Sequence, residues 1–388
     1  MNRHENTKLN NEEFSRGETI LKSYPTVLFV ELTQNCNLSC FMCRASKGYQ
    51  QELNMSDEIF NKLKSELFPL AHTIDLRGYG ESTILKKFND KLDETALSGA
   101  KIRLVTNALA IKKSLWTQLM SNNTTVVVSV DSANEMTMKN LGRGDFEQLK
   151  KSIKIGITER EKYGFKGVIY FNTVVSSYNI NELCEIIKFA KSYNVDRITM
   201  FPVVANKENP LNLMYSENEL KDALTRATIT AKKVDIELRL GASLSDSLVL
   251  DKGLPEKCSH PWEYCYIDYA GNVGYCDHLI GHKALMLGNL NNTSFTDIWN
   301  NNKFQQLRAE HNKARKGGTE EMQFNLPHCN WCYKRRYIDF EEETNVNAKS
   351  RIISTSSCDN LFTPKTNIIK ETQFLKGRNL PFKKLNNL

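Results

Sequence analysis

The sequence has no apolar run long enough to cross a membrane. A transmembrane helix needs roughly 18 consecutive apolar residues, and every apolar run in this chain is shorter. The first residues, MNRHENTKLNNEEFSRGE, are polar and lack the apolar segment of a secretory signal. We therefore expect a cytoplasmic protein without a transmembrane segment. Its ten cysteines are then expected to be metal ligands or free thiols rather than disulfides.

The sequence also lacks internal repeats and long low-complexity segments, and its excess positive charge is local. The net charge is +7, and residues 345–388 contain eight Lys or Arg but only Asp359 and Glu371 as acids. The rest of the chain is therefore nearly neutral. We interpret this end as a solubilising tail, with attraction of an acidic partner as the alternative. No nucleic-acid partner is expected.

Short runs of β-branched residues alternate with longer stretches of helical apolar spacing. We expect strands over 27–33, 73–78, 101–107, 125–131, 168–175 and 197–204. We expect helices near 56–67, 87–98, 111–120, 145–162 and 179–193. This alternation is typical of parallel βαβ units. The predicted fold class is therefore α/β, a partial (β/α)6 barrel followed by a small cysteine-rich α+β domain.

The same pattern suggests five regions in the chain. They are a polar N-terminal extension at 1–24, the core barrel at 25–205, a connector helix and strand at 206–257, a small cysteine-rich domain at 258–340 and a basic tail at 341–388. In barrels of this kind the chemistry collects where the strands end. Polar and glycine residues follow each expected strand of the core. We therefore expect one site along this rim.

Three cysteines follow the first expected strand in the order C-x3-C-x2-C. They are Cys36, Cys40 and Cys43. Three thiolates from one loop can hold three corners of a [4Fe–4S] cluster, and full ligation by protein needs a fourth. No fourth cysteine lies near, so one iron is left open for another ligand. A zinc loop is the alternative, but zinc requires four ligands and the fourth would come from far away.

This spacing resembles the signature of the radical S-adenosylmethionine (radical SAM) enzymes, and the run LRGYGES resembles that family's glycine-rich loop. The resemblance implies that the reduced cluster cleaves SAM to a 5′-deoxyadenosyl radical, which abstracts a hydrogen atom from the substrate. It implies SAM contacts from Met42, Gly78, Gly80, Glu81, Thr106, Asn107, Ser129, Asp131, Arg143 and Phe201. The resemblance covers roughly residues 25–205.

Individual roles also follow from the resemblance. Glu81 is expected to meet the ammonium group of SAM, and Arg143 to pair with its carboxylate through the planar guanidinium. Two positions depart from the family pattern. Ser82 replaces the usual proline, and Met42 stands where an aromatic residue is common.

A second set of cysteines lies in the C-terminal region. Cys258, Gly271 and Cys276 follow C-x12-G-x4-C, and Cys329 and Cys332 form C-x2-C. This pattern resembles the shortened SPASM, or twitch, domain. The resemblance implies that the four cysteines ligate one auxiliary [4Fe–4S] cluster. The run IDYAGNVGYC predicts a β-hairpin with a tight turn.

Two alternatives stay open in this region. Cys265 is the alternate fourth ligand in place of Cys258, or a core residue of the hairpin. A four-cysteine set with C-x2-C also suits zinc. No cysteine lies in 334–340, so we expect a single auxiliary cluster.

An auxiliary cluster near the substrate can accept an electron from a substrate radical, which makes the overall reaction a dehydrogenation. The arrangement resembles the dehydrogenases that oxidise an alcohol of an aminocyclitol. We therefore expect an oxidoreductase acting on a sugar-like or aminocyclitol-like alcohol, with a flavodoxin or ferredoxin as electron donor.

Three alternatives remain open. One is a maturase that forms thioether or C–C links, or epimers, in a ribosomal peptide. Only about 25 residues precede the first expected strand, which argues against a leader-binding domain. Another is a sugar epimerase with Cys265 as hydrogen-atom donor. The third is a non-catalytic electron-transfer protein, which the glycine-rich loop beside an open iron argues against.

Overall fold

The computed structural model describes residues 1–43, 50–203, 210–211, 213, 217–241, 258–276, 286–316, 329 and 353–354. Three predictions concern residues outside this set. They are Cys332, much of the connector predicted at 206–257 and nearly all of the tail at 341–388. No helix of the described residues is long and apolar enough to cross a membrane.

A curved parallel sheet forms the core. Its strands are β1 Val27–Val30, β2 Thr73–Asp75, β3 Lys101–Thr106, β4 Thr125–Ser129, β5 Val168–Val175, β6 Arg197–Pro202 and β7 Glu237–Leu240. Each pairs in parallel with the next in chain order. The six expected strands are therefore confirmed, and the connector strand extends the barrel by one.

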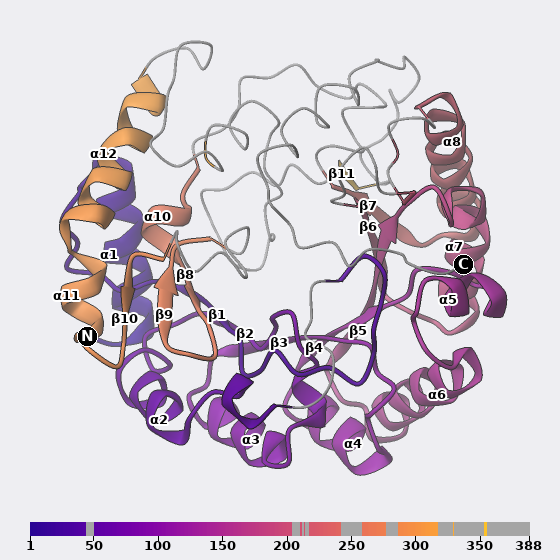
Figure 1. Ribbon diagram of the computed structural model, residues 1–388, viewed down its shortest axis with the longest axis horizontal. Coiled ribbons are helices and arrows are strands. Elements are labelled where there is room, and N and C mark those ends of the chain that lie inside the picture. The colour runs from indigo at the N-terminus through magenta and orange to yellow at the C-terminus, as the bar shows by residue number, and fades with distance from the viewer. Residues whose placement is uncertain are drawn as a thin grey trace.

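Helices cover the outer side of this sheet (Figure 1). They are α2 Asp57–Glu66, α3 Phe88–Leu97, α4 Lys113–Ser121, α5 Glu135–Asn140, α6 Phe146–Tyr163, α7 Leu183–Ser192 and α8 Glu217–Val234. In β3, Ile102 and Leu104 are buried in the core, whereas Arg103 and Val105 alternate with them and are half-buried. Side chains of a strand alternate between faces. The half-buried set therefore lies on the concave side.

Local signals explain where several helices begin and end. Ser56 caps α2 by accepting a hydrogen bond from the backbone N–H of Ile59 at 3.2 Å. Asp145 caps α6 in the same way, and Gly164 ends that helix with a left-handed φ of 63°. Such caps satisfy backbone groups that have no partner inside the helix. They keep each helix short enough to return the chain to the next strand.

The hairpin expected in the cysteine-rich region extends the core sheet. Its strands are β8 Tyr264–Ile267 and β9 Asn272–Gly274, with the short β10 Gly288–Asn289 beside β9. Gly271 has φ 79° in the turn. Strand β8 pairs in parallel with β1, so Phe29 lies opposite Tyr266. At the far edge, β11 Ile353–Ser354 runs antiparallel to β7. Edge strand β1 thus gains a partner from more than 230 residues away.

The N-terminal region forms a helix that packs beside the cysteine-rich region (Figure 1). Helix α1 Arg3–Arg16 contacts α10 His260–Glu263, which in turn contacts α12 Asn302–Lys316. Asn10 is fully buried and donates from Nδ2 to the backbone oxygen of Trp262 at 2.7 Å. Buried polar groups need such partners. The buried polar residues of this helix, Asn6, Asn10 and Glu13, therefore serve as internal hydrogen-bonding groups.

Candidate functional site

The loop that follows β1 presents the first three cysteines at different depths. Cys40 is buried, Cys36 is half-buried and Cys43 is exposed. The backbone N–H of Cys43 donates to the carbonyl of Cys40 at 3.0 Å, which closes a tight turn between them. Burial, with smaller contributions from Glu81, Cys43 and Cys40, raises the pKa of the Cys36 thiol to about 11. The three thiols are thus close enough to influence one another.

The donor set of this loop fits an iron–sulfur cluster better than a single ion. Among the described residues, no three His, Cys, Asp or Glu side chains are grouped so that they could hold one metal ion. A tetrahedral zinc site needs its thiolates gathered around one centre. A cubane cluster takes each thiolate on a separate iron, which lets the sulfurs stand further apart. Cys36, Cys40 and Cys43 would hold three of those irons.

The glycine-rich loop packs tightly against the loop that carries the cysteines. A Cβ on Gly80 would lie 2.3 Å from the carbonyl oxygen of Thr33 and 2.6 Å from that of Asn35. A Cβ on Gly78 would lie 2.3 Å from Cγ of Glu31. Both positions therefore require glycine for contact between loops. The structure adds this reason to the expected approach of a ligand.

Glu81 joins the glycine-rich loop to the end of β3. Its buried carboxylate accepts hydrogen bonds from the hydroxyl and N–H of Thr83, at 2.6 and 3.3 Å. It also accepts from the Thr106 hydroxyl and from the Asn107 N–H, both at 2.7 Å. Burial raises the pKa of this carboxyl group. Four protein donors engage Glu81, so its role in this structure is to align two strand ends.

Asn107 reaches from the end of β3 towards the cysteine loop. Its Nδ2 donates to Oδ1 of Asn37 at 2.9 Å and lies 3.9 Å from Sγ of Cys36. The backbone N–H of Leu38 also donates to Sγ of Cys36, at 3.4 Å. The hydrogen bond from Leu38 favours the thiolate of Cys36 and offsets part of the effect of burial, which favours the thiol.

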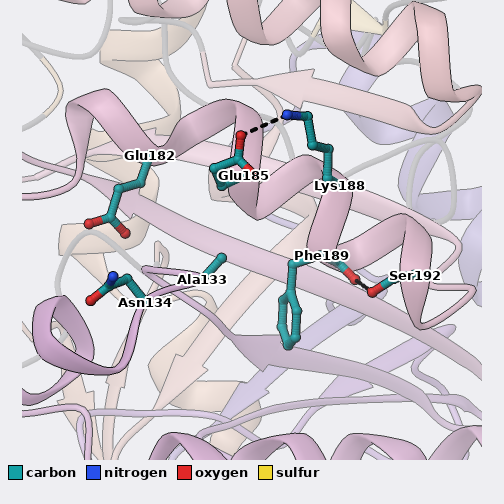
Figure 2. Close-up of a pocket in the computed structure, with 7 residues that line it drawn as sticks. All are labelled: Ala133, Asn134, Glu182, Glu185, Lys188, Phe189 and Ser192. Atoms are coloured by element: carbon teal, nitrogen blue, oxygen red, sulfur yellow. Dashed lines mark hydrogen bonds and ion pairs between the residues drawn. The ribbon is translucent and has the colours of Figure 1, made fainter.

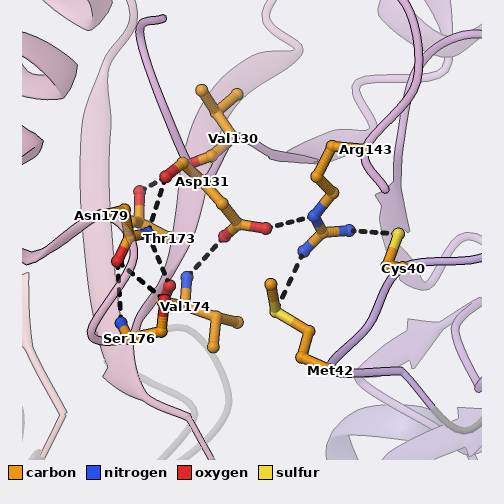
Figure 3. Close-up of polar contacts among 9 residues, drawn as sticks. All are labelled: Cys40, Met42, Val130, Asp131, Arg143, Thr173, Val174, Ser176 and Asn179. Carbon is orange, nitrogen blue, oxygen red and sulfur yellow. Dashed lines mark hydrogen bonds and ion pairs between the residues drawn. The ribbon is translucent and has the colours of Figure 1, made fainter. Parts of the chain in front are cut away.

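Arg143 occupies the centre of a polar cluster beside the same loop (Figure 3). Its Nε pairs with the carboxylate of Asp131. Its Nη1 lies 3.6 Å from Sγ of Cys40 and its Nη2 lies 3.9 Å from Sδ of Met42. The Asp131 carboxylate also accepts from the backbone N–H of Val174 at 2.7 Å. Arg143 therefore contacts two other residues expected at the SAM site, Met42 and Asp131.

The sequence analysis missed a buried residue that contacts the backbone of Asp131. Asn179 is fully buried and donates from Nδ2 to the backbone oxygens of Asp131 and Val174, at 2.6 and 2.9 Å (Figure 3). Its Oδ1 accepts from the backbone N–H of Ser176 at 2.7 Å. Asn179 thus ties the ends of β4 and β5 together. Its sequence context, SSYN, resembles an ordinary turn and gave no signal of this role.

Two further residues expected at the SAM site lie along the concave rim. Ser129 ends β4 and lies opposite Asn172 of β5. Phe201 lies on β6 opposite Val174. A Cβ on Gly241 would lie 2.7 Å from the Phe201 ring, so the ring rests against the end of β7. Strand β6 stands across the barrel from β1, so the rim between them spans the expected SAM site (Figure 1).

Glu31 was also missed by sequence analysis, although it directly follows β1. It is fully buried and accepts from the Tyr79 N–H at 2.9 Å, from Nε2 of Gln34 at 3.1 Å and from the Tyr266 hydroxyl at 3.1 Å. Burial, with a smaller contribution from the nearby Asp268, raises the pKa of Glu31 to about 7. Glu31 therefore links the cysteine loop, the glycine-rich loop and β8. The signal that could have identified Glu31 is a carboxylate directly after an apolar strand.

The second cysteine set converges on the hairpin. Cys258, Cys276 and Cys329 are all buried. Each of them acts electrostatically on the buried phenol of Tyr275, whose hydroxyl lies 2.8 Å from Sγ of Cys329. These three cysteines fit the same cluster chemistry as the first set. Cys332 lies outside the part of the chain that the structure describes.

Cys265 behaves differently from these three. It lies on β8 and is fully buried, and burial alone raises its pKa well above the usual range. None of the other cysteines contributes to that shift. This is the surrounding of a core thiol, which favours Cys258 as the ligand.

An open pocket of about 480 Å³ lies elsewhere, between α7 and the segment leading into α5 (Figure 2). Its lining includes Asn134, Glu182 and Phe189, together with Lys188 paired to Glu185 at 2.7 Å. It contains no cysteine and no residue expected to contact SAM. We therefore place the functional site at the strand ends and not in this pocket.

Two family models match the chain. The radical SAM superfamily model matches residues 30–190, and the model of the SPASM iron–sulfur cluster-binding domain matches residues 258–333. The chain is 22% identical to the tungsten-containing aldehyde ferredoxin oxidoreductase cofactor-modifying protein of Pyrococcus furiosus, over 85% of this chain and 94% of that protein. It is 23% identical to the mycofactocin maturase MftC of Mycolicibacterium smegmatis, over 76% and 75% of the two chains.

Solved structures show the same fold. SuiB of Streptococcus suis bound to its precursor peptide SuiA has a TM-score of 0.61 at 16% identity, covering 79% of this chain and 71% of that one. Native anSMEcpe with bound AdoMet has a TM-score of 0.57 at 17% identity, covering 74% and 84%. These likenesses confirm the partial barrel.

The two family matches also confirm the resemblance inferred from the cysteine spacings. They account for both cysteine sets with one protein architecture. The chain therefore belongs to the radical SAM enzymes, which use SAM and a [4Fe–4S] cluster, and it carries a C-terminal SPASM domain for auxiliary iron–sulfur binding.

Proposed function

We propose that this enzyme removes two electrons from its substrate and that an alcohol of a sugar-like or aminocyclitol-like small molecule is oxidised to a ketone. In the net reaction one hydrogen atom, one electron and one proton leave the alcohol. SAM is converted to methionine and 5′-deoxyadenosine. When bound, the first cluster supplies reductive cleavage of SAM and the auxiliary cluster supplies an acceptor for one electron.

One observation carries the proposal. The two cysteine sets are attached to neighbouring strands of one sheet, because β1 leads into the loop of Cys36 while β8 and β9 lead into Cys276. Hydrogen bonds along β1 and β8 fix the spacing between the two sets. A substrate radical formed beside the first set would then have a fixed acceptor on the same rigid frame.

The residues have distinct parts in this proposal. Cys36, Cys40 and Cys43 would hold the open cluster, and the fork of Arg143 would orient the SAM carboxylate. The contacts of Arg143 with Asp131, Cys40 and Met42 support this, since they fix the guanidinium beside the open cluster. Glu81 would align the glycine-rich loop with the end of β3 for the methionyl group. In this proposal Cys258, Cys276, Cys329 and Cys332 hold the acceptor cluster.

A second candidate is modification of a ribosomally made peptide. The relatives named MftC are maturases, and the chain shares 23–26% identity with them over about three quarters of its length. Formation of a cross-link in a peptide also removes electrons from the substrate. It would use the same two sets of cysteines.

The first experiment separates the two centres. Full-length protein purified anaerobically is reduced with dithionite and incubated with SAM, and 5′-deoxyadenosine is measured. We expect Cys40→Ala to reduce its formation to the level without enzyme. We expect Cys276→Ala to retain SAM cleavage. Loss of cleavage in Cys276→Ala with intact iron at the first centre would contradict the separate roles.

The second experiment identifies the substrate class. Wild-type enzyme and SAM are incubated with a panel of aminocyclitols and sugar alcohols, or with synthetic precursor peptides. A ketone formed with one equivalent of 5′-deoxyadenosine, and absent in Cys276→Ala, supports alcohol oxidation. A peptide that loses two mass units while the alcohols stay unchanged supports the maturase. Ketone formation by Cys276→Ala would rule out the auxiliary centre as electron acceptor.

A further inference from the structure

Two buried side chains lie within hydrogen-bond distance of the sulfurs of the second cysteine set. The hydroxyl of Tyr275 lies 2.8 Å from Sγ of Cys329, and Nδ1 of His260 lies 3.3 Å from Sγ of Cys276. Both side chains are only 2% exposed. Neither residue was singled out by its sequence, and neither is one of the cysteine ligands.

The direction of both hydrogen bonds follows from the chemistry of a ligated cysteine. A thiolate bound to iron carries no proton and can only accept. The Tyr275 hydroxyl must then donate to Cys329, and His260 must carry its proton on Nδ1 to donate to Cys276. Hydrogen bonds to charged acceptors are stronger than those between neutral groups.

The two donors also connect the separate chain segments that carry the cysteines. His260 lies two residues after Cys258 and reaches the sulfur of Cys276, while Tyr275 directly precedes Cys276 and reaches the sulfur of Cys329. Each ligand-bearing segment thus supplies a donor to the next. The His260 ring is held by contact with Tyr264, with ring centroids 4.0 Å apart.

We infer that His260 and Tyr275 are positioning residues that raise the reduction potential of the auxiliary cluster through hydrogen bonds to its thiolates. Reduction adds negative charge to a cluster and its sulfurs. Donors aimed at those sulfurs stabilise the reduced form more than the oxidised form. The inference rests on the proposed function, in which this centre accepts an electron, and it identifies the residues that make acceptance favourable.

The test is a redox titration of the full-length chain, followed by electron paramagnetic resonance at one fixed pH. Cys36, Cys40 and Cys43 are replaced by alanine in every sample, so that a single cluster signal remains. Tyr275→Phe and His260→Phe remove one donor each. Tyr266→Phe is the matched control, because it removes a buried hydroxyl from the neighbouring strand that donates to Glu31 and not to a thiolate.

We expect more negative midpoint potentials for Tyr275→Phe and for His260→Phe, and an unchanged one for Tyr266→Phe. The amide of His260→Asn can donate from nearly the position of Nδ1. This variant should therefore recover most of the midpoint potential that His260→Phe loses. A purely structural role would lower iron content without this rescue. Equal potentials in the variants and in the parent, at full iron content, would overturn the inference.

Failure of the proposed function gives a different result. In that case the wild-type enzyme forms no ketone in the substrate assay, whereas the midpoint potentials of the parent and of its variants can still be measured and compared. If Tyr275→Phe loses its iron, the comparison of His260→Phe with His260→Asn decides the inference, since both keep Tyr275 in place.

Discussion

The two cysteine sets of this protein differ in exposure and in the charge of their neighbours. In the first set, Cys43 is exposed and Cys36 is half-buried, whereas Cys258, Cys276 and Cys329 are all buried. A centre that binds a cosubstrate must be open on one side. A centre that only exchanges electrons is better enclosed, because burial excludes water and competing reactions.

The donors near the sulfurs differ in the same sense. The guanidinium of Arg143 lies against Cys40, so a full positive charge stands beside the open set. Beside the closed set lie the hydroxyl of Tyr275 and the imidazole of His260. A charged neighbour suits the binding of an anionic group such as the SAM carboxylate. A hydroxyl donor such as that of Tyr275 adjusts the energy of an added electron without attracting an anionic ligand.

Gly80→Ala should produce the largest difference between the two centres. The added methyl would overlap the carbonyl oxygens of Thr33 and Asn35, which are backbone atoms and cannot rotate away. Overpacking of this kind costs about 1–3 kcal/mol. Here it would displace the loop that carries Cys36. We expect 5′-deoxyadenosine formation to fall to background while the signal of the auxiliary cluster remains.

Gly164→Ala is the control for this change. Gly164 has a left-handed φ but faces open space at the end of α6. We expect a stability loss of roughly 1 kcal/mol with normal SAM cleavage. Equal loss of cleavage in both variants would show that the crowding against the cysteine loop is not the cause.

A smaller effect is expected from Arg143→Lys. The lysine keeps the charge but cannot contact Asp131, Cys40 and Met42 together, as the planar fork does. Loss of a charge-assisted hydrogen bond costs about 1.5–3 kcal/mol, so the efficiency of SAM cleavage should fall about 10- to 100-fold. The measurement is the KM for SAM and the rate of 5′-deoxyadenosine formation.

The matched variant is Arg160→Lys, which alters an ion pair with Asp196 at 2.5 Å on the outer side of the barrel. It should leave both kinetic parameters unchanged, and neither variant should move the potential of the auxiliary cluster. A normal KM for SAM in Arg143→Lys would show that Arg143 does not bind SAM.

The core elements could be predicted because their signals are local. β-branched runs marked all six strands, and Ser56 marked the start of α2. The contact between β1 and β8 could not be predicted, because parallel pairing between distant segments leaves no local pattern. Helix α1 was missed for another reason. Its buried contacts come from polar residues such as Asn6 and Asn10, which sequence patterns assign to the surface.

In the functional site too, local sequence signals could be read, whereas contacts between distant segments could not. Cysteine spacing predicted both sets of cluster ligands, strand-end position predicted site roles for Glu81 and Asp131, and the family resemblance supplied Arg143. The geometry then gave Glu81 and Asp131 partners within the protein. Their hydrogen bonds to Asn107 and Val174 depend on how neighbouring strands align. Glu31 was missed because Tyr266, one of its partners, is 235 residues away.

The smallest effect should come from Glu31→Gln, which tests the link between the glycine-rich loop and β8. Burial raises the pKa of Glu31 from its ordinary value of 4.5 to about 7. Between these values the folded protein holds a proton that the unfolded chain has released. This contribution to stability is therefore complete below pH 4.5 and is lost as the pH rises through 7. The glutamine variant has no titratable group at this position and carries no such dependence.

Between pH 6 and pH 8 the wild type should therefore lose about 1.4 kcal/mol of stability relative to Glu31→Gln. The measurement is the difference in anaerobic thermal unfolding midpoint across this range. Tyr266→Phe removes one hydrogen bond to Glu31 but keeps the carboxyl group, so it should retain the pH dependence. Parallel pH profiles for wild type and Glu31→Gln would mean that Glu31 is ionised in both states. The link between the glycine-rich loop and β8 would then be a charged one.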